Sequence, residues 1–152
     1  MFQTYIGAYA MGKCEWIEMA DVKKIAISLI NKYDDKFGKI PYERLKFIGI
    51  LNAKPPKEHN KIWHFVFIAD PVNELLETDL AVIINFDCWS DMDEKAQAIV
   101  VASMLSCMEC KERIVARGYD LHDSKSMVLN FGVDYETNPD IPDIINTHHH
   151  WR

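Results

Sequence analysis

The sequence predicts an α+β fold in which a small, mainly antiparallel sheet is packed by a long, buried central helix and by flanking helices. Two observations lead to this prediction. The run from Asp91 to Arg117 reads as one helix, and its middle, Ala96 to Met108, is apolar on nearly every side, which is typical of a buried helix. Two or three strand-like segments precede this run without a full helix between them. Such an order favours a small antiparallel sheet that helices cover on one face.

The first element is a helix that we expect to begin at its capping residue, Asp21, and to run to about Lys36. Apolar residues recur at helical spacing on one face of this segment, and Gly38 ends it. The residues of that face are Val22, Ile25, Ala26, Leu29, Ile30 and Tyr33. Residues 1–14 give no clear pattern.

Strands are predicted at Leu45–Leu51, Trp63–Ala69 and Leu80–Phe86. The last of these is the clearest, because it is short, rich in β-branched residues and bounded by polar ones. Prolines and charges mark Asn52–Asn60 as a loop, and Pro71–Glu77 is expected to form a helical turn.

The central helix should have a cap at either end. Asp91 or Asp93 is expected to begin it, and Gly118 to end it. A shorter helix is predicted over Asp123–Phe131. The Pro-rich, acidic tail, residues 136–152, is expected to lie along the surface or to be partly loose.

Length and composition are those of an ordinary globular chain. The 152 residues suffice for a sizeable core, so residues 1–152 are predicted as a single domain. A net charge of −6 disfavours a nucleic-acid binder, which would carry a basic patch. No apolar run approaches the roughly 18 residues of a membrane span, and the N-terminus does not read as a signal peptide. Four sparse cysteines are typical of reduced thiols in a cytoplasmic protein.

The sequence from Asp79 to Tyr135 contains several pieces in the order of a known family. The strand at Leu80–Phe86 is followed by CWSDMDEKAQA, residues 88–98, which opens the central helix. The pair His122-Asp123 and the segment SKSMVLNFGVDY come later. In this order the chain resembles the phage metallopeptidase family, small zincin-like proteins of phages and prophages. The resemblance implies a zincin-like α+β fold whose long helix carries an H-E-x-x-H motif.

The motif itself is missing from this chain. Ser103, Met104 and Cys107 stand where the family has the first histidine, the glutamate and the second histidine, while His122 and Asp123 remain. Two histidines four residues apart on a helix hold zinc, and the glutamate takes a proton from the zinc-bound water. A serine hydroxyl is a poor zinc ligand, and methionine cannot act as a base. The resemblance therefore implies a degenerate member with no catalytic residues and no cofactor.

If the chain keeps the family's fold but has lost its catalytic residues, it should be a noncatalytic phage or prophage protein that acts by binding another macromolecule. We expect that macromolecule to be a protein. An anti-defence role against a bacterial immune protein follows from the phage association alone. Neither nucleic acid nor a membrane is an expected partner, and the oligomeric state stays open. The alternatives are an unrelated α+β domain with an ordinary core helix, and an assembly protein that associates with itself through an aromatic face.

A residual zinc-dependent hydrolase is the other function that the residues leave open. Cys107 and Cys110 form a C-x-x-C whose sulfurs would face one side of the predicted helix. With His122 they would make a partial zinc site, and Glu109 or Asp123 would then act as the base. The simpler structural interpretations are two core thiols and a histidine beside a helix cap.

Two other groups of residues have a functional and a structural interpretation. The histidine triplet at 148–150 would bind a metal ion nonspecifically, or belong to a tail without a site. Trp63, Phe65 and Phe67 alternate along a predicted strand. This pattern indicates core packing or, if that face is exposed, a surface for a partner.

Overall fold

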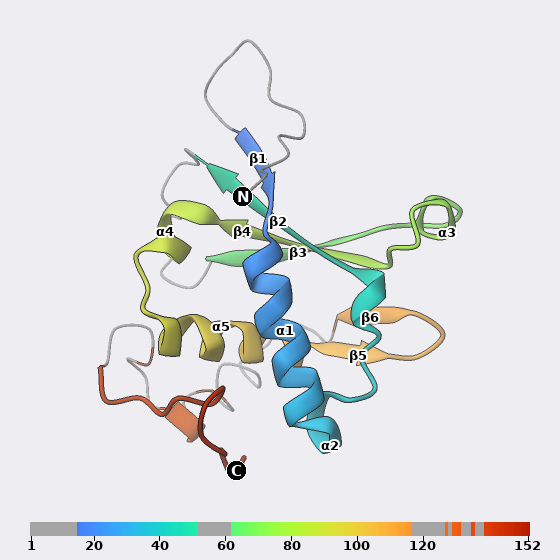
Figure 1. The fold of residues 1–152 in the computed structure, drawn as a ribbon. Coiled ribbons are helices and arrows are strands. Elements are labelled where there is room, and N and C mark those ends of the chain that lie inside the picture. The colour runs from blue at the N-terminus through green and yellow to red at the C-terminus, as the bar shows by residue number, and fades with distance from the viewer. Residues whose placement is uncertain (1–14, 52–61, 117–126, 128, 132–134, 136–138) are drawn as a thin grey trace. The chain divides into compact units, whose positions relative to one another are not determined.

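The structure is a computed structural model (Figure 1). It describes residues 15–51, 62–116, 127, 129–131, 135 and 139–152. These residues form helices and a small sheet, which confirms the predicted α+β class. The chain divides into two compact units, and the division falls inside the first helix, α1 (Ala20–Lys32). The first unit comprises Met1–Lys23 and Glu43–Asp91, and the second comprises Lys24–Tyr42 and Met92–Arg152. The zincin-like arrangement and the single domain stay predictions.

The first unit is built on a four-stranded sheet. Its strands, in their order across the sheet, are β1 (Glu15–Glu18), β2 (Leu45–Leu51), β4 (Leu80–Asn85) and β3 (Trp63–Phe67). β1 runs antiparallel to β2, and β3 runs antiparallel to β4, but the central pair of β2 and β4 is parallel. The sheet is therefore mixed. The expectation of antiparallel pairing is right for the outer pairs and wrong for the centre.

The parallel centre is consistent with the sequence of β4. Residues Leu80 to Ile84 are all buried, so both faces of this strand are covered. Continuous apolar runs of this kind are typical of strands with a parallel neighbour, whereas a half-exposed antiparallel strand alternates apolar with polar residues. β3 pairs with the other side of β4 and forms an edge of the sheet.

β1 was not predicted, and a glycine makes room for it. Gly49 of β2 pairs with Ile17, and a Cβ atom at this position would lie 2.6 Å from Sδ of Met19. Met19 donates its backbone N–H to the carbonyl of Phe47 at 2.9 Å. Glycine therefore lets the Met19 side chain pack directly against β2, and a larger residue here would displace it.

Two short helices flank β4 in the first unit. α3 (Val72–Leu75) lies between β3 and β4, at the end of their hairpin, and confirms the helical turn predicted at Pro71–Glu77 (Figure 1). α4 (Phe86–Ser90) follows β4 directly. Asn85 caps α4, because its Oδ1 accepts a hydrogen bond from the N–H of Cys88 at 3.2 Å.

The second unit contains most of α1, the short helix α2 (Asp34–Phe37) and the central helix α5 (Glu94–Ser106). α5 begins as predicted, at the N-cap Asp93, whose Oδ1 accepts a hydrogen bond from the N–H of Ala96 at 2.8 Å. Nearly all its residues from Ala96 to Leu105 are buried, as expected of a helix that is apolar all round. However, α5 ends at Ser106, so the helix predicted to reach Arg117 is too long.

A β-hairpin replaces the last part of that predicted helix. β5 (Met108–Cys110) pairs antiparallel with β6 (Ile114–Ala116). The N–H of Lys111 donates to the carbonyl of Arg113 at 3.0 Å and closes the turn. Ile114 is fully buried, and β-branched residues such as this one fit a pleated, half-buried surface. Gly118, the expected helix end, lies outside the described residues.

The remaining described residues belong to the C-terminal part of the chain. Of the helix predicted over Asp123–Phe131, Met127 and residues 129–131 are helical, and the others lie outside the described residues. Residues 139–152 form turns and extended segments. None of the helices described is long and apolar enough to cross a membrane.

Candidate functional site

The positions that align with the family motif lie in the core of the second unit. Met104 of α5 is fully buried, and Ser103 is 8% exposed. Cys107 is the C-cap of α5, where its N–H donates to the carbonyls of Ser103 and Met104 at 3.2 and 3.1 Å. The thiol of Cys107 is buried as well. His122 and Asp123, the two retained positions, lie outside the described residues.

The described positions do not fit a zincin metal centre. Such a centre needs two imidazole ligands and a carboxylate that can reach a metal-bound water. The chain supplies a hydroxyl at Ser103 and a thioether at Met104. Neither group replaces a neutral imidazole or a base.

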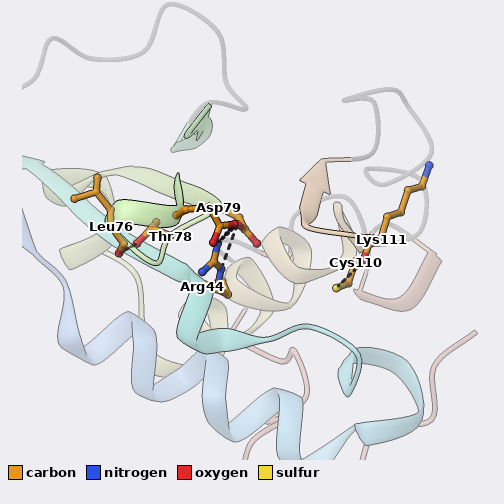
Figure 2. Close-up of polar contacts among 7 residues, drawn as sticks. Arg44, Leu76, Thr78, Asp79, Cys110 and Lys111 are labelled. Atoms are coloured by element: carbon orange, nitrogen blue, oxygen red, sulfur yellow. Dashed lines mark hydrogen bonds and ion pairs between the residues drawn. The ribbon is translucent and has the colours of Figure 1, made fainter. Parts of the chain in front are cut away.

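The C-x-x-C does not have the helical geometry that we predicted. Cys107 ends α5 and is buried, whereas Cys110 lies on β5 and is exposed. The Cys110 thiol instead lies 3.7 Å from the carbonyl oxygen of Lys111, as a weak hydrogen-bond donor (Figure 2). The prediction that both sulfurs face the same side of a helix is therefore wrong, because the helix ends before the second cysteine. Within the described ranges, no three His, Cys, Asp or Glu side chains are grouped to hold a metal ion.

The C-terminal segment, expected to be a surface or loose tail, is held by α1 in the second unit. The ammonium group of Lys32 donates hydrogen bonds to three backbone carbonyls, at 3.0 Å for Ile144 and 2.6 Å for Ile145, and also to Thr147. Ile144 is fully buried. An ammonium group that binds several carbonyls of one segment holds that segment in place. The described tail residues are therefore part of the packed unit.

The hydroxyl of Tyr33 also forms hydrogen bonds with this segment. Tyr33 donates to the carbonyl of Ile144 at 2.7 Å and accepts from the N–H of His149 at 3.0 Å. Burial raises the pKa of the Tyr33 hydroxyl. The turn between these contacts is set locally by Asp143, whose Oδ1 accepts from the N–H of Asn146 at 3.0 Å. That hydrogen bond lowers the pKa of the Asp143 carboxyl.

Aromatic rings from α2, its N-cap Tyr33 and the helical residues 129–131 form a cluster around Trp151 of the C-terminal segment. Its ring lies edge-on to the rings of Tyr33, Phe37 and Phe131, with centroids 5.5, 5.7 and 5.5 Å away. The ammonium group of Lys36 lies 4.7 Å from the centroid of the Trp151 ring. The histidine triplet thus belongs to an ordered segment. Sequence analysis missed this cluster, although Tyr33 and Phe37 stand four residues apart.

His149 of the C-terminal segment contacts the helical residues 129–131. Its Nε2 lies 3.1 Å from Oδ1 of Asn130. Burial is the first cause of a lowered pKa for His149, and the neighbouring positive charges of His150, His148, Arg152 and Lys36 add to it. When the pKa of a histidine is lower in the folded than in the unfolded chain, the folded state is favoured at pH values above the unfolded pKa, which is near 6.5. This stabilisation is lost as the pH falls through the folded value.

We therefore expect acid to weaken the second unit through His149. The free energy of unfolding of the natural chain should fall relative to that of His149→Gln between about pH 7 and pH 5, since glutamine does not titrate in this window. Urea unfolding of both proteins across this range measures the difference. A difference that stays constant with pH would contradict the expectation.

A partly buried ion pair lies at the start of β4 in the first unit. Nη2 and Nε of Arg44 lie 2.7 and 3.2 Å from the same oxygen of Asp79, which is 3% exposed (Figure 2). The N–H of Asp79 donates to the Arg44 carbonyl at 2.9 Å. The hydrogen bond with Asp79 is the first cause of a raised pKa for Arg44. The pair joins the ends of β2 and β4, and sequence analysis missed it.

No protein-family model, curated protein or solved structure matches this chain. The resemblance to the phage metallopeptidase family therefore stays a prediction.

Proposed function

We propose that this chain is a noncatalytic, metallopeptidase-like protein of a phage or prophage, and that it acts by binding another protein. One observation carries the proposal. Met104, in the position of the family's general base, is fully buried within α5. A general base must come within hydrogen-bond reach of the proton that it removes. A buried thioether has neither the chemistry nor the access that this task needs.

The neighbouring positions support the same conclusion. Ser103 and Cys107 are buried beside Met104, and their backbone groups bond to one another at the end of α5. Their side chains therefore serve packing. The phage setting, and a role against a bacterial immune protein, come from the resemblance alone and are part of the proposal on that basis. A zinc hydrolase built on Cys107 and Cys110 has less support, because one thiol is buried and the other is exposed.

Metal content and peptidase activity test the proposal together. We expect protein purified without a histidine tag to hold less than about 0.2 zinc per chain, because a functional site should be nearly full. We also expect no cleavage of unfolded casein. Cys110→Ser is the matched variant and should leave both results unchanged.

Two results would overturn the proposal. One is zinc near one per chain that is lost in Cys107→Ser. The other is a peptidase activity that a chelator abolishes. Either result would favour the residual zinc hydrolase, and His122→Ala would then test its third ligand.

A further inference from the structure

The α3 turn exposes three large aliphatic side chains on one face. Val72, Leu75 and Leu76 are 48, 80 and 59% exposed. Their spacing of three and four residues puts them on the same side of a helical turn. Single exposed apolar residues are ordinary, but a group of them on one element is typical of an interaction site. In Figure 1 this turn lies at the end of the β3–β4 hairpin, beyond the paired part of the sheet.

The same turn carries an excess of negative charge. From Asp70 to Asp79 the sequence contains the four acidic residues Asp70, Glu74, Glu77 and Asp79 and no basic one. Arg44 pairs closely with Asp79 at 2.7 Å and more loosely with Glu74 at 3.5 Å. Because Arg44 pairs mainly with the buried Asp79, the two glutamates of the turn, Glu74 and Glu77, give the surface beside the aliphatic face a negative charge.

Hydrogen bonds hold the turn in one conformation. The N–H of Asn73 donates to the Ala69 carbonyl at 3.1 Å, and the N–H of Thr78 donates to the Asn73 carbonyl at 2.9 Å. The hydroxyl of Thr78 donates to the carbonyl of Leu76 at 3.0 Å (Figure 2). A surface that is already ordered loses little conformational entropy on binding. The exposed leucines are therefore suited to act as anchors.

From these observations we infer that the α3 turn is a docking surface for a protein partner that presents an apolar pocket or helix face bordered by lysine or arginine. Val72, Leu75 and Leu76 supply the apolar contact. Glu74 and Glu77 pair with the basic border, which raises the association rate and sets the orientation. This inference rests on the proposed function and adds the chemistry of the partner.

The negative charge of the α3 turn favours a basic protein partner over a second copy of the chain, a membrane or a nucleic acid. A second copy would place two acidic turns against each other, and like charges in an interface cost free energy. An anionic membrane and a nucleic acid would be repelled in the same way. A basic protein surface satisfies both the leucines and the carboxylates.

A model peptide tests the inference without knowledge of the natural partner. The probe is a helical peptide of about fourteen leucine and lysine residues, with the leucines on one face. The control peptide has glutamate in place of lysine. We expect the lysine peptide to shift amide NMR signals of residues 70–79 in the full chain, and the glutamate peptide to leave them unchanged. Raising NaCl from about 50 to 300 mM should weaken the binding.

Variants then assign the contact to particular side chains. Leu75→Ser with Leu76→Ser should weaken binding by about tenfold, as expected for two anchors. Leu129→Ser, which changes an exposed leucine of the other unit, should have no effect. Glu74→Gln with Glu77→Gln should reduce the salt dependence. If the double leucine variant does not fold, the double glutamate variant still tests the inference through the salt dependence of binding.

Several outcomes would overturn the inference. They are signal shifts that map elsewhere, binding that the leucine variant retains, and equal binding of the glutamate peptide. Sedimentation with phosphatidylserine vesicles would assign the turn to a membrane instead, and dimerisation that Leu75→Ser abolishes would assign it to a second copy. Any of these leaves the proposed function standing, because that function depends on zinc content and peptidase activity.

Discussion

Met104→Glu, which restores the glutamate of the metallopeptidase motif, should destabilise the protein by about 3–5 kcal/mol at neutral pH, as expected for an uncompensated buried charge. The reason is the position of Met104, which is fully buried in α5. In an active zincin the same residue must reach water, so its carboxylate remains solvated. The substitution therefore distinguishes a packed core position from the floor of an open cleft.

The dependence on pH identifies the cause of this loss. Burial raises the pKa of a carboxyl above its unfolded value, near 4.3, because the charged form is disfavoured. The deficit of Met104→Glu should thus be smallest below about pH 4 and should grow as the pH rises through the folded pKa. Met104→Gln has nearly the same shape without the charge, so its deficit should not change with pH. Met104→Leu conserves volume and should cost less than about 1.5 kcal/mol.

Urea unfolding between about pH 4 and pH 8 measures these differences. If Met104→Glu is as stable as Met104→Gln near pH 8, the glutamate side chain reaches solvent. Position 104 would then be open, as the base of an active enzyme must be. The observation that carries the proposed function would be lost.

Strands β2, β3 and β4 and the start of α5 could be predicted because their signals are local. β4 is a short, β-branched run between polar residues, and Asp93 stands directly before the apolar stretch that it caps. The end of α5 could not be predicted in the same way. A helix that is apolar all round has no polar face whose interruption marks its end, and Cys107 to Cys110 continue the apolar spacing. Pairing with Ile114–Ala116 decides the structure there.

The contacts that matter for the site have no local signal. Arg44 and Asp79 are 35 residues apart, and Tyr33 meets Ile144 across 111 residues. Only the fold brings such pairs together. The parallel pairing of β2 with β4 is of the same kind, since a sequence shows that a strand is covered on both faces but not which strand is its neighbour. The helical turn at α3 was predicted, but its exposed aliphatic face was not, since that exposure depends on the turn lying at the end of a hairpin.

The C-terminal segment provides the second large effect, because Trp151 joins it to α2 and to the N-cap of that helix, Tyr33. Trp151→Ala should lower the free energy of unfolding by about 3 kcal/mol, near the lower end of the range for buried tryptophans because this ring is half-buried. The edge-on contacts of the ring with Tyr33, Phe37, Phe131 and His149 are lost together. Amide hydrogen exchange of residues 139–152 should increase at the same time, because the hydrogen bonds with Lys32, Tyr33 and Asn130 would then hold the segment without the ring packing.

Two variants separate ring packing from hydrogen bonding in this segment. Tyr33→Phe keeps the ring and removes the hydroxyl, so it should cost about 1 kcal/mol through the contacts with Ile144 and His149. Leu129→Ala removes an exposed side chain of the same unit and should change stability by less than about 0.5 kcal/mol. If Trp151→Ala costs no more than Leu129→Ala, residues 139–152 do not stabilise the unit. The histidine triplet would then be a tail, as the sequence first suggested, and acid should no longer weaken the protein through His149.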